Sequence, residues 1–190
     1  AFGITTMLAI LLLRDAETDG PGGAPVIAGM GGFGLMSAAV AAGMGVAAVV
    51  APWAMARVRR ILVVALGAAL AATAQAVVGP TLDPTALVSG AVVIGLGAQL
   101  IKLVADNAMQ TDVPDARRGG VFALQDALFN TAFVVGMVAV LPLVPGDGRS
   151  VPLMAVPAVL YGLAGAIELV VATRSRSEAR DPDAQGTSAD

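Results

Sequence analysis

No charged side chain occurs between Asp19 and Arg57. This stretch is longer than the roughly 20 apolar residues that a helix needs to cross the hydrocarbon layer of a bilayer. The whole chain is 57% hydrophobic and 13% charged, and its mean hydropathy is +0.82. Such a composition is typical of an integral membrane protein and not of a water-soluble domain. We therefore predict an all-α integral membrane fold.

Apolar runs separated by short polar turns predict six transmembrane helices. They cover residues 1–13, 25–55, 61–78, 85–111, 121–143 and 151–172. The first run is too short to span a bilayer, so we interpret it as the distal part of a truncated helix, with a short core or interfacial helix as the alternative. An acidic Gly/Pro-rich loop is expected at 15–23. Residues 1–173 then form one six-helix domain, and 174–190 form a disordered tail.

Two of these helices have compositions that predict their surroundings. Glycine and alanine dominate 25–55, and small residues allow close approach of helix backbones in lipid. The helix at 61–78 carries little polarity beyond Thr73 and Gln75, which favours a lipid-facing position at the outside of the bundle.

Positive charge is concentrated on one side of the predicted bundle. Six alternating crossings place the turns at 57–60 and 112–120 on the side of the tail, which carries eight arginines against two on the other side. The positive-inside rule makes the arginine-rich side cytoplasmic. We therefore predict a multi-pass protein of the cell inner (plasma) membrane with a cytoplasmic tail. The arginines of its two basic turns are Arg57, Arg59, Arg60, Arg117 and Arg118.

The two groups of three helices have opposite orientations. The basic turn lies between the second and third helices of the first group, and between the first and second helices of the other group. An inverted-topology repeat requires this relation. The sequence therefore predicts a six-transmembrane-helix bundle built as a 3+3 inverted repeat.

A polar stripe runs along one face of the predicted helix at 85–111. At 100° per residue, Gln99, Lys102 and Asp106 fall on this face together. Lys102 and Asp106 have the spacing of an ion pair along one helix. The next helix carries Asp126 on a face that also holds Asn130. We expect the hairpin to place the Lys102 cation between the two carboxylates.

Charged groups inside a membrane usually face the interior of a bundle or an aqueous path. Lys102, Asp106 and Asp126 could therefore form a gate, a proton-coupling site or part of a substrate path, with Gln99 and Asn130 lining it. The alternative is a satisfied polar network that only holds the two helices together. The residues alone leave both interpretations open.

Enzymatic and nucleic-acid functions receive no support. The chain has no histidine and no cysteine, which removes the commonest metal ligand, the usual base at neutral pH and all thiolate chemistry. The net charge is -3, and no basic patch is interleaved with aromatic residues. We predict no cofactor, no metal site, no nucleic-acid partner and no enzyme activity.

The turn after the fourth predicted helix resembles a known family. Residues 113–122 read V-P-D-A-R-R-G-G-V-F, which is similar to the V-P-D-x-x-R-G-R-V-F turn between the tenth and eleventh helices of bacterial efflux-type members of the major facilitator superfamily. The segment after the turn and the Lys-x-x-x-Asp pattern of Lys102 and Asp106 also look like this subgroup. One departure is Gly120, which stands where the family has arginine. The basic turn at 56–60 resembles only a shortened form of the superfamily's loop.

This resemblance implies that the chain is the C-terminal half, helices seven to twelve, of a secondary transporter. Its first and fourth helices would line a central cavity, the second and fifth would meet the missing N-terminal six-helix half, and the third and sixth would face lipid. The expected function is export of a small molecule by alternating access, with protons as a possible coupling ion. The rival interpretations are a six-helix scaffold or accessory subunit that acts as a homo-oligomer, and an intramembrane enzyme.

Overall fold

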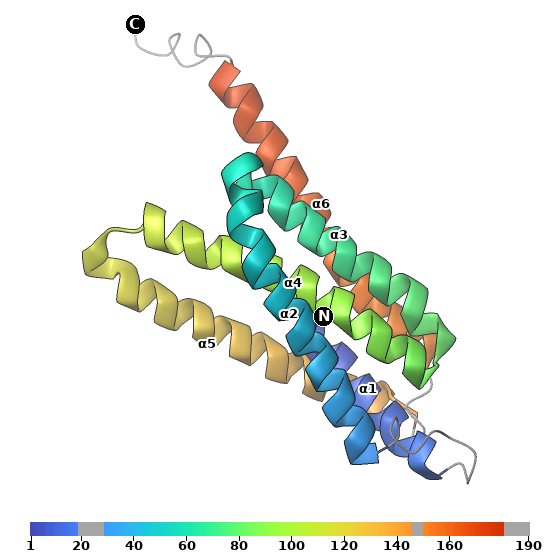
Figure 1. The fold of residues 1–190 in the computed structure, drawn as a ribbon. Helices are drawn as coiled ribbons and strands as arrows, with labels where there is room; N and C mark the ends of the chain where they lie inside the picture. Colours follow the sequence, from blue (N-terminus) through green and yellow to red (C-terminus); the bar gives the residue numbers. More distant parts are fainter. Residues whose placement is uncertain (19–28, 146–149, 181–190) are drawn as a thin grey trace, which may run out of the picture.

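The chain folds into a bundle of apolar helices (Figure 1). The computed structural model describes residues 1–18, 29–145 and 150–180. Six α-helices and two short 3-10 turns, Gly79–Thr81 and Leu141–Leu143, make up the described part, which contains no strand. The helices are α1 (Phe2–Thr18), α2 (Gly29–Arg57), α3 (Arg60–Val78), α4 (Pro84–Asp112), α5 (Asp115–Val140) and α6 (Val151–Arg180).

The predicted all-α membrane fold is confirmed. Five helices, α2 to α6, are long and apolar enough to cross a bilayer. In α1 the apolar part is the shorter segment Phe2–Leu13. The chain is thus a multi-pass membrane protein by the length and composition of its helices.

Three helix ends differ from the predicted ones. α1 continues to Thr18 and takes up the first residues of the predicted loop, while residues 19–28 lie outside the described part. α5 begins at Asp115, directly after Pro114, so both arginines of the predicted turn are helical. α6 continues to Arg180, and 181–190 lie outside the described residues. The reason is physical: an apolar run ends at the membrane surface, whereas arginine, glutamate and alanine favour continued helix in water.

Local chemistry determines where α4 begins. The carboxylate of Asp83 accepts a hydrogen bond of 2.8 Å from the backbone N–H of Ala86, and Pro84 occupies the first position of the helix. An acceptor side chain at the N-cap satisfies a free helix N–H, and proline at the first position loses no helical bond. This end lies opposite the polar end of α4 and fixes the start of the helix that carries the candidate site.

Helix pairing links the two halves of the bundle. α4 packs against both α2 and α3, α3 packs also along α6, and α1 rests on α5 and α2 (Figure 1). A 3+3 repeat relates α1 to α4, α2 to α5 and α3 to α6. Under this relation the α2–α4 pair corresponds to the α5–α1 pair, and the α3–α6 pair corresponds to itself. These two pairs agree with a 3+3 inverted repeat, whereas the extensive α3–α4 pair corresponds to a much smaller α1–α6 contact.

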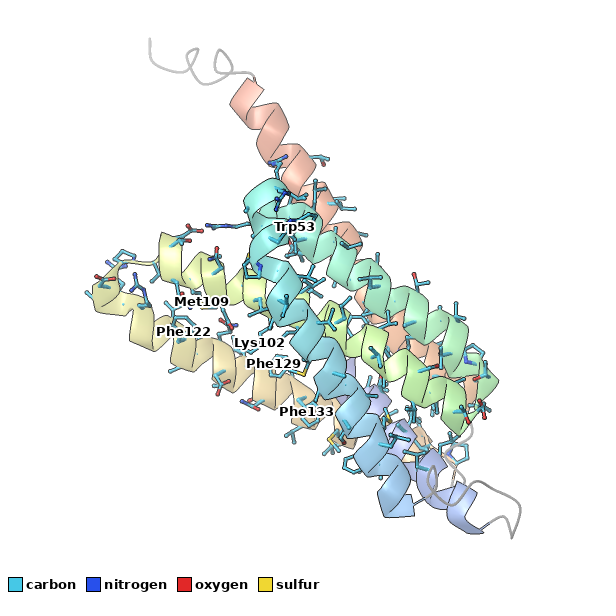
Figure 2. The ribbon with its side chains drawn as sticks, in the orientation of Figure 1. Trp53, Lys102, Met109, Phe122, Phe129 and Phe133 are labelled. Carbon is cyan, nitrogen blue, oxygen red and sulfur yellow. The ribbon has the colours of Figure 1, made fainter. Side chains whose placement is uncertain are left out.

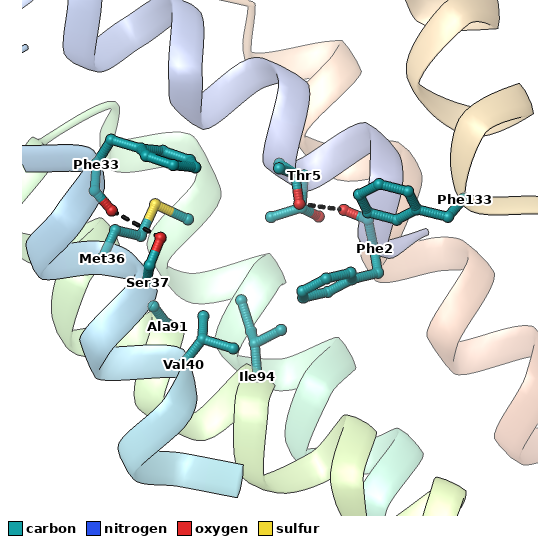
Figure 3. A pocket seen from close by; sticks show the side chains of 10 residues that line it. Phe2, Thr5, Phe33, Met36, Ser37, Val40, Ala91, Ile94 and Phe133 are labelled. Atoms are coloured by element: carbon teal, nitrogen blue, oxygen red, sulfur yellow. Dashed lines mark hydrogen bonds between the residues drawn. The ribbon is translucent and has the colours of Figure 1, made fainter. Parts of the chain in front are cut away.

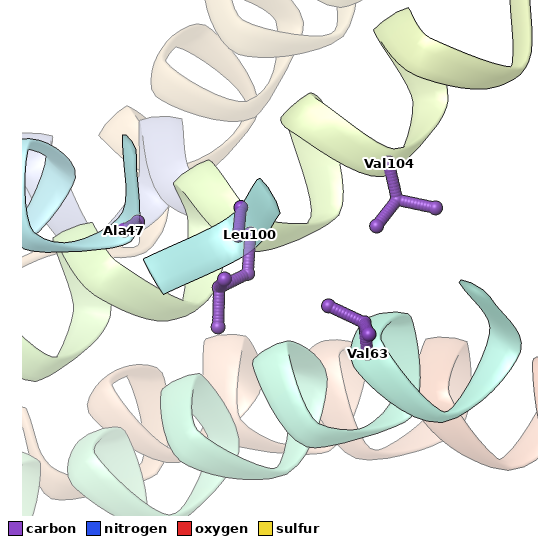
Figure 4. Packing of buried hydrophobic residues seen from close by; sticks show 5 residues of the cluster. Ala47, Val63, Leu100 and Val104 are labelled. Atoms are coloured by element: carbon purple, nitrogen blue, oxygen red, sulfur yellow. The ribbon is translucent and has the colours of Figure 1, made fainter. Parts of the chain in front are cut away.

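The best-buried apolar cluster joins α2, α3 and α4 (Figure 4). It consists of Ala47, Ala51, Val63, Leu100 and Val104. Close backbone contact accompanies this cluster, as the small residues of α2 predicted. A Cβ atom on Gly43 would overlap the carbonyl oxygen of Val92, and one on Gly95 would overlap that of Val40.

α3 is less peripheral than its composition predicted. Only one of its faces is open, where Leu62, Leu66 and Val77 are exposed, and the opposite face is buried against α4 and α6. The helix could not be placed from hydropathy alone, because alanine and glycine are equally suited to lipid contact and to close helix packing.

A buried hydrogen-bond network ties α1, α3 and α6 together. The side chain of Gln75 is 1% exposed. Its Nε2 donates to the carbonyl oxygen of Met154 at 3.1 Å, and its Oε1 accepts from the Thr5 hydroxyl at 3.3 Å. Pro157 lies one turn beyond Met154 inside α6, where proline interrupts the helical hydrogen-bond ladder. Gln75 thus satisfies a carbonyl next to this interruption.

Candidate functional site

The ion pair predicted along α4 is present. Lys102 Nζ donates to Asp106 Oδ2 at 2.7 Å. The lysine side chain is 47% exposed and that of the aspartate 21%. Both residues line a pocket between α4 and α5, and Figure 2 shows Lys102 on the side of α4 that faces α5. Neither is buried in the core of the chain, so the pair remains accessible to a ligand, to water or to another part of the protein.

Gln125 of α5 completes the surroundings of Asp106, and sequence reasoning missed this residue. Its Nε2 donates to Asp106 Oδ1 at 3.3 Å. Asp106 therefore accepts one hydrogen bond on each oxygen, one from its own helix and one from the neighbouring helix. The available signal was its place in the sequence, because Gln125 directly precedes Asp126, the residue that was expected at this site.

Asp126 is not part of this ion pair, which corrects the expected arrangement. Within the described residues no cation lies within ion-pair distance of its carboxylate, so Lys102 is held by one carboxylate and not between two. Asp126 is offset from Gln125 by 100° around α5. It nevertheless lines the same pocket of about 190 Å³ between α4 and α5.

Aromatic rings close this pocket on the side of α5. Phe122 and Phe129 lie one turn before and one turn after Asp126, and both line the pocket (Figure 2). The opposite wall is formed by Ala98 and Ala105 of α4, whose small side chains leave space. We call this space the α4–α5 pocket.

A larger apolar pocket adjoins the α4–α5 pocket. Its volume is about 410 Å³, and five helices contribute to it. The two pockets share Ala98, Ile101, Lys102 and Phe129. Gln99 lines the larger pocket. Asn130 lines neither; its Nδ2 donates at 2.8 Å to the backbone carbonyl of Asp126.

A third pocket lies between α1, α2, α4 and α5 near the other end of the bundle (Figure 3). Its volume is about 210 Å³. The hydroxyl groups of Ser37 and Thr6 both donate to backbone carbonyls of their own helices, at 2.8 and 3.0 Å. Their donor hydrogens are thus used within their own helices, so these two groups can offer a ligand only acceptor oxygens. The polar chemistry of the bundle is concentrated at the α4–α5 pocket.

The basic turns lie together at one end of the bundle. The guanidinium of Arg60 donates to the Asp112 carboxylate at 3.0 Å and to the Thr111 hydroxyl at 3.0 Å. This contact joins the start of α3 to the end of α4. The two turns therefore share one side of the bundle, as six alternating crossings require.

The other arginines of these turns make local contacts or point outward. The guanidinium carbon of Arg57 lies 4.3 Å from the centre of the Trp53 ring. Arg118 Nη2 lies 2.6 Å from Asp115 Oδ1. Arg59 and Arg117 are exposed. Cations and a tryptophan at the end of apolar helices are typical of the interface between membrane and water.

Two curated proteins are similar to the chain. Both are named as uncharacterized MFS-type transporters, one from Mycobacterium bovis and one from Mycobacterium tuberculosis. Each is 36% identical over 148 residues, which is 78% of this chain and 32% of the relative. The chain thus spans about a third of the length of these relatives. Their names support a membrane transporter of the major facilitator superfamily.

No protein-family model matches the chain, and no solved structure matches it.

Proposed function

We propose that the chain is the C-terminal six-helix half of a major facilitator transporter that exports a small molecule. The similarity to the two mycobacterial proteins and the pairing of the helices as a 3+3 repeat support this assignment. The resemblance of residues 113–122 to the efflux-type turn supports export. The missing partner would be an N-terminal six-helix half.

The single observation that carries the proposal is the Lys102–Asp106 pair inside a membrane span, next to a pocket. A charged pair at this depth costs free energy, and such charges in transporters usually serve the transported substrate or ion. Lys102 borders both the α4–α5 pocket and the larger apolar pocket. A change in this side chain would therefore alter the lining of both pockets.

The geometry suggests how protons would be coupled to transport. Asp106 accepts hydrogen bonds from Lys102 and Gln125 in its ionised form. Protonation would remove the charge that holds Lys102 and weaken both bonds. The freed lysine could then move within the shared wall of the two pockets. The two halves would rock around this site in alternating access.

The orientation of the protein in the membrane is part of the proposal. The turns that hold Arg57, Arg60 and Arg118 would lie in the cytoplasm, together with the C-terminal tail. The Arg60 contact to Asp112 supports a common side for the two turns. The membrane would be the cell inner membrane.

A vesicle experiment tests the proposed function. The full-length gene product is reconstituted in proteoliposomes with a pH-sensitive dye inside, and proton flux is followed when small organic ions are added. We expect Asp106→Asn and Lys102→Ala to lower substrate-driven proton flux about tenfold or more, since each removes one partner of the intramembrane pair. Asp115→Asn is the matched control, because Asp115 lies at the exposed start of α5 and outside the pockets.

If both pocket variants insert normally and drive proton flux at the level of the parent, the pair is only structural. The assignment of these residues to transport would then be withdrawn.

A further inference from the structure

We propose that the pocket between α1, α2, α4 and α5 binds a small, neutral aromatic molecule that carries an N–H or O–H donor, of the indole or phenol class. We call this space, drawn in Figure 3, the aromatic pocket. It shares no residue with the α4–α5 pocket. The site is therefore separate from the Lys102–Asp106 pair, and the inference goes beyond the proposed transport. Three observations carry it: the size of the pocket, its phenylalanine rings and the bonds that its hydroxyl groups already make.

The size of the aromatic pocket suits a ligand of one or two fused rings. A cavity of roughly 150 Å³ that is lined by leucine, isoleucine and phenylalanine stays dry and binds benzene. The aromatic pocket has a volume of about 210 Å³ and is also lined mainly by apolar side chains. It therefore has room for a substituted benzene or for a bicyclic molecule such as indole.

Phenylalanine rings lie on two sides of this space. Figure 3 shows Phe33 of α2 on one side, and Phe2 of α1 with Phe133 of α5 on the other. The ring centroids of Phe2 and Phe133 are 5.8 Å apart. Phe33 is 43% exposed, so part of its ring has no protein neighbour. Aromatic rings favour offset or edge-to-face contacts with one another, and an aromatic ligand would supply such contacts to both sides.

The hydroxyl groups of the pocket have already used their donor hydrogens. Those of Ser37 and Thr6 donate to backbone carbonyls of their own helices, at 2.8 and 3.0 Å. The hydroxyl of Thr5 donates to Gln75 Oε1 at 3.3 Å. A hydroxyl oxygen that donates its hydrogen can still accept a hydrogen bond. Ser37 is exposed and Thr6 is half-buried, so these two residues remain accessible as acceptors.

This arrangement selects against charged ligands. An anion would meet hydroxyl oxygens that have no hydrogen left to donate. A cation would lose its hydration without gaining a counter-ion, because no acidic side chain is among the described residues that line the pocket. A neutral molecule with one donor group matches both the acceptors and the apolar walls.

Three ligands of similar size test the inference. Indole carries an N–H donor, benzofuran has the same shape with an oxygen in place of this N–H, and benzylammonium is a cation. Their binding to the full-length protein in lipid nanodiscs is measured by calorimetry, and empty nanodiscs give the contribution of the lipid. We expect indole to bind about three- to tenfold more tightly than benzofuran, as one hydrogen bond predicts, and benzylammonium to bind most weakly.

Variants assign the preference for indole to the two hydroxyl groups. The double variant Ser37→Ala/Thr6→Val removes both acceptors and should bind indole and benzofuran equally. Ser37→Thr keeps the hydroxyl group and should keep the preference. Ser89→Ala is the matched control, because the Ser89 hydroxyl also donates to a carbonyl of its own helix, at 2.7 Å, but lies outside the pocket.

Four outcomes would overturn the inference. They are no saturable binding of indole, equal binding of indole and benzofuran to the parent, tighter binding of benzylammonium, and a preference for indole that survives the double variant. None of these measurements involves proton flux, so the site and the proposed transport are tested independently.

Discussion

Single buried polar residues stabilise the bundle where apolar packing alone does not determine which helices pair. Lipid is as apolar as leucine, so packing in a membrane depends on van der Waals contact and on hydrogen bonds between helices. Gln75 links three helices through Thr5 and the carbonyl oxygen of Met154. Replacing Gln75 should therefore lower the stability of the folded protein.

Replacement of Gln75 tests this role. Gln75→Leu keeps the approximate size but leaves the Met154 carbonyl buried without its donor, which should destabilise the protein by about 1–3 kcal/mol. Thr5→Val removes only the longer bond and should have a smaller effect. The measurement is unfolding of the purified protein by increasing SDS in mixed micelles. Thr73→Val on the exposed face of α3 is the control. A Gln75→Leu variant as stable as the parent would show that the network contributes nothing.

The candidate site was predictable only in its local part. Lys102 and Asp106 lie one turn apart on one helix, so their pairing follows from helical geometry alone. Contacts between helices depend on the rotation of each helix about its own axis. The hairpin placed α5 beside α4 correctly, but the residue that reaches Asp106 is Gln125 and not Asp126. One residue corresponds to 100° of rotation, which no sequence pattern in the turn specified.

At the scale of elements, close approach of backbones determines which helices pair. α2 and α4 meet at Gly43 and Gly95, where any side chain would collide with a carbonyl group of the other helix. Other glycines of α2, such as Gly34 and Gly45, face open space. The sequence predicted close packing from small residues. It could not distinguish the glycines that contact another helix from those that face open space, because both kinds lie in the same glycine- and alanine-rich stretch.

A pair of alanine substitutions separates the two groups of glycines. Gly43→Ala should push α2 and α4 apart and destabilise the protein by about 1–3 kcal/mol, as overpacked cores do. Gly45→Ala, two residues away on the same helix, should change the stability little, since nothing lies within 4 Å of the new methyl group. Both are measured by thermal unfolding in detergent. Equal effects of the two substitutions would contradict the contact between α2 and α4.

At the scale of the whole molecule, the turns alternate between two sides. Apolar run length gave the helices and their order, because crossing a bilayer requires a minimum of apolar residues. Helix ends outside the bilayer were misplaced at Thr18, Asp115 and Arg180, where hydropathy carries no signal. The proposed sidedness is a property of all helices together and can be tested directly.

Cysteine labelling tests the sidedness. The chain has no cysteine, so within these 190 residues a single introduced thiol is the only one that can react. Thr81→Cys lies in the turn between α3 and α4, and Ala116→Cys lies at the start of α5. In intact cells a membrane-impermeant maleimide should label position 81 and not position 116, which should react only after permeabilisation. The reverse pattern would invert the topology, and labelling of both would remove a crossing.

The docking of α1 has a consequence for biogenesis. α1 meets α5 where the rings of Phe2 and Phe133 lie 5.8 Å apart and where Gly3 touches the Phe133 backbone. On a translating ribosome, about 130 residues separate these partners, which corresponds to on the order of ten seconds of synthesis. During that interval α1 can pack only on α2, on α4 and on Gln75 of α3. α1 precedes the other described helices in the chain yet is among the last to reach its final place, and a nascent chain arrested before α5 would present the uncovered face of α1 to insertion factors and membrane proteases.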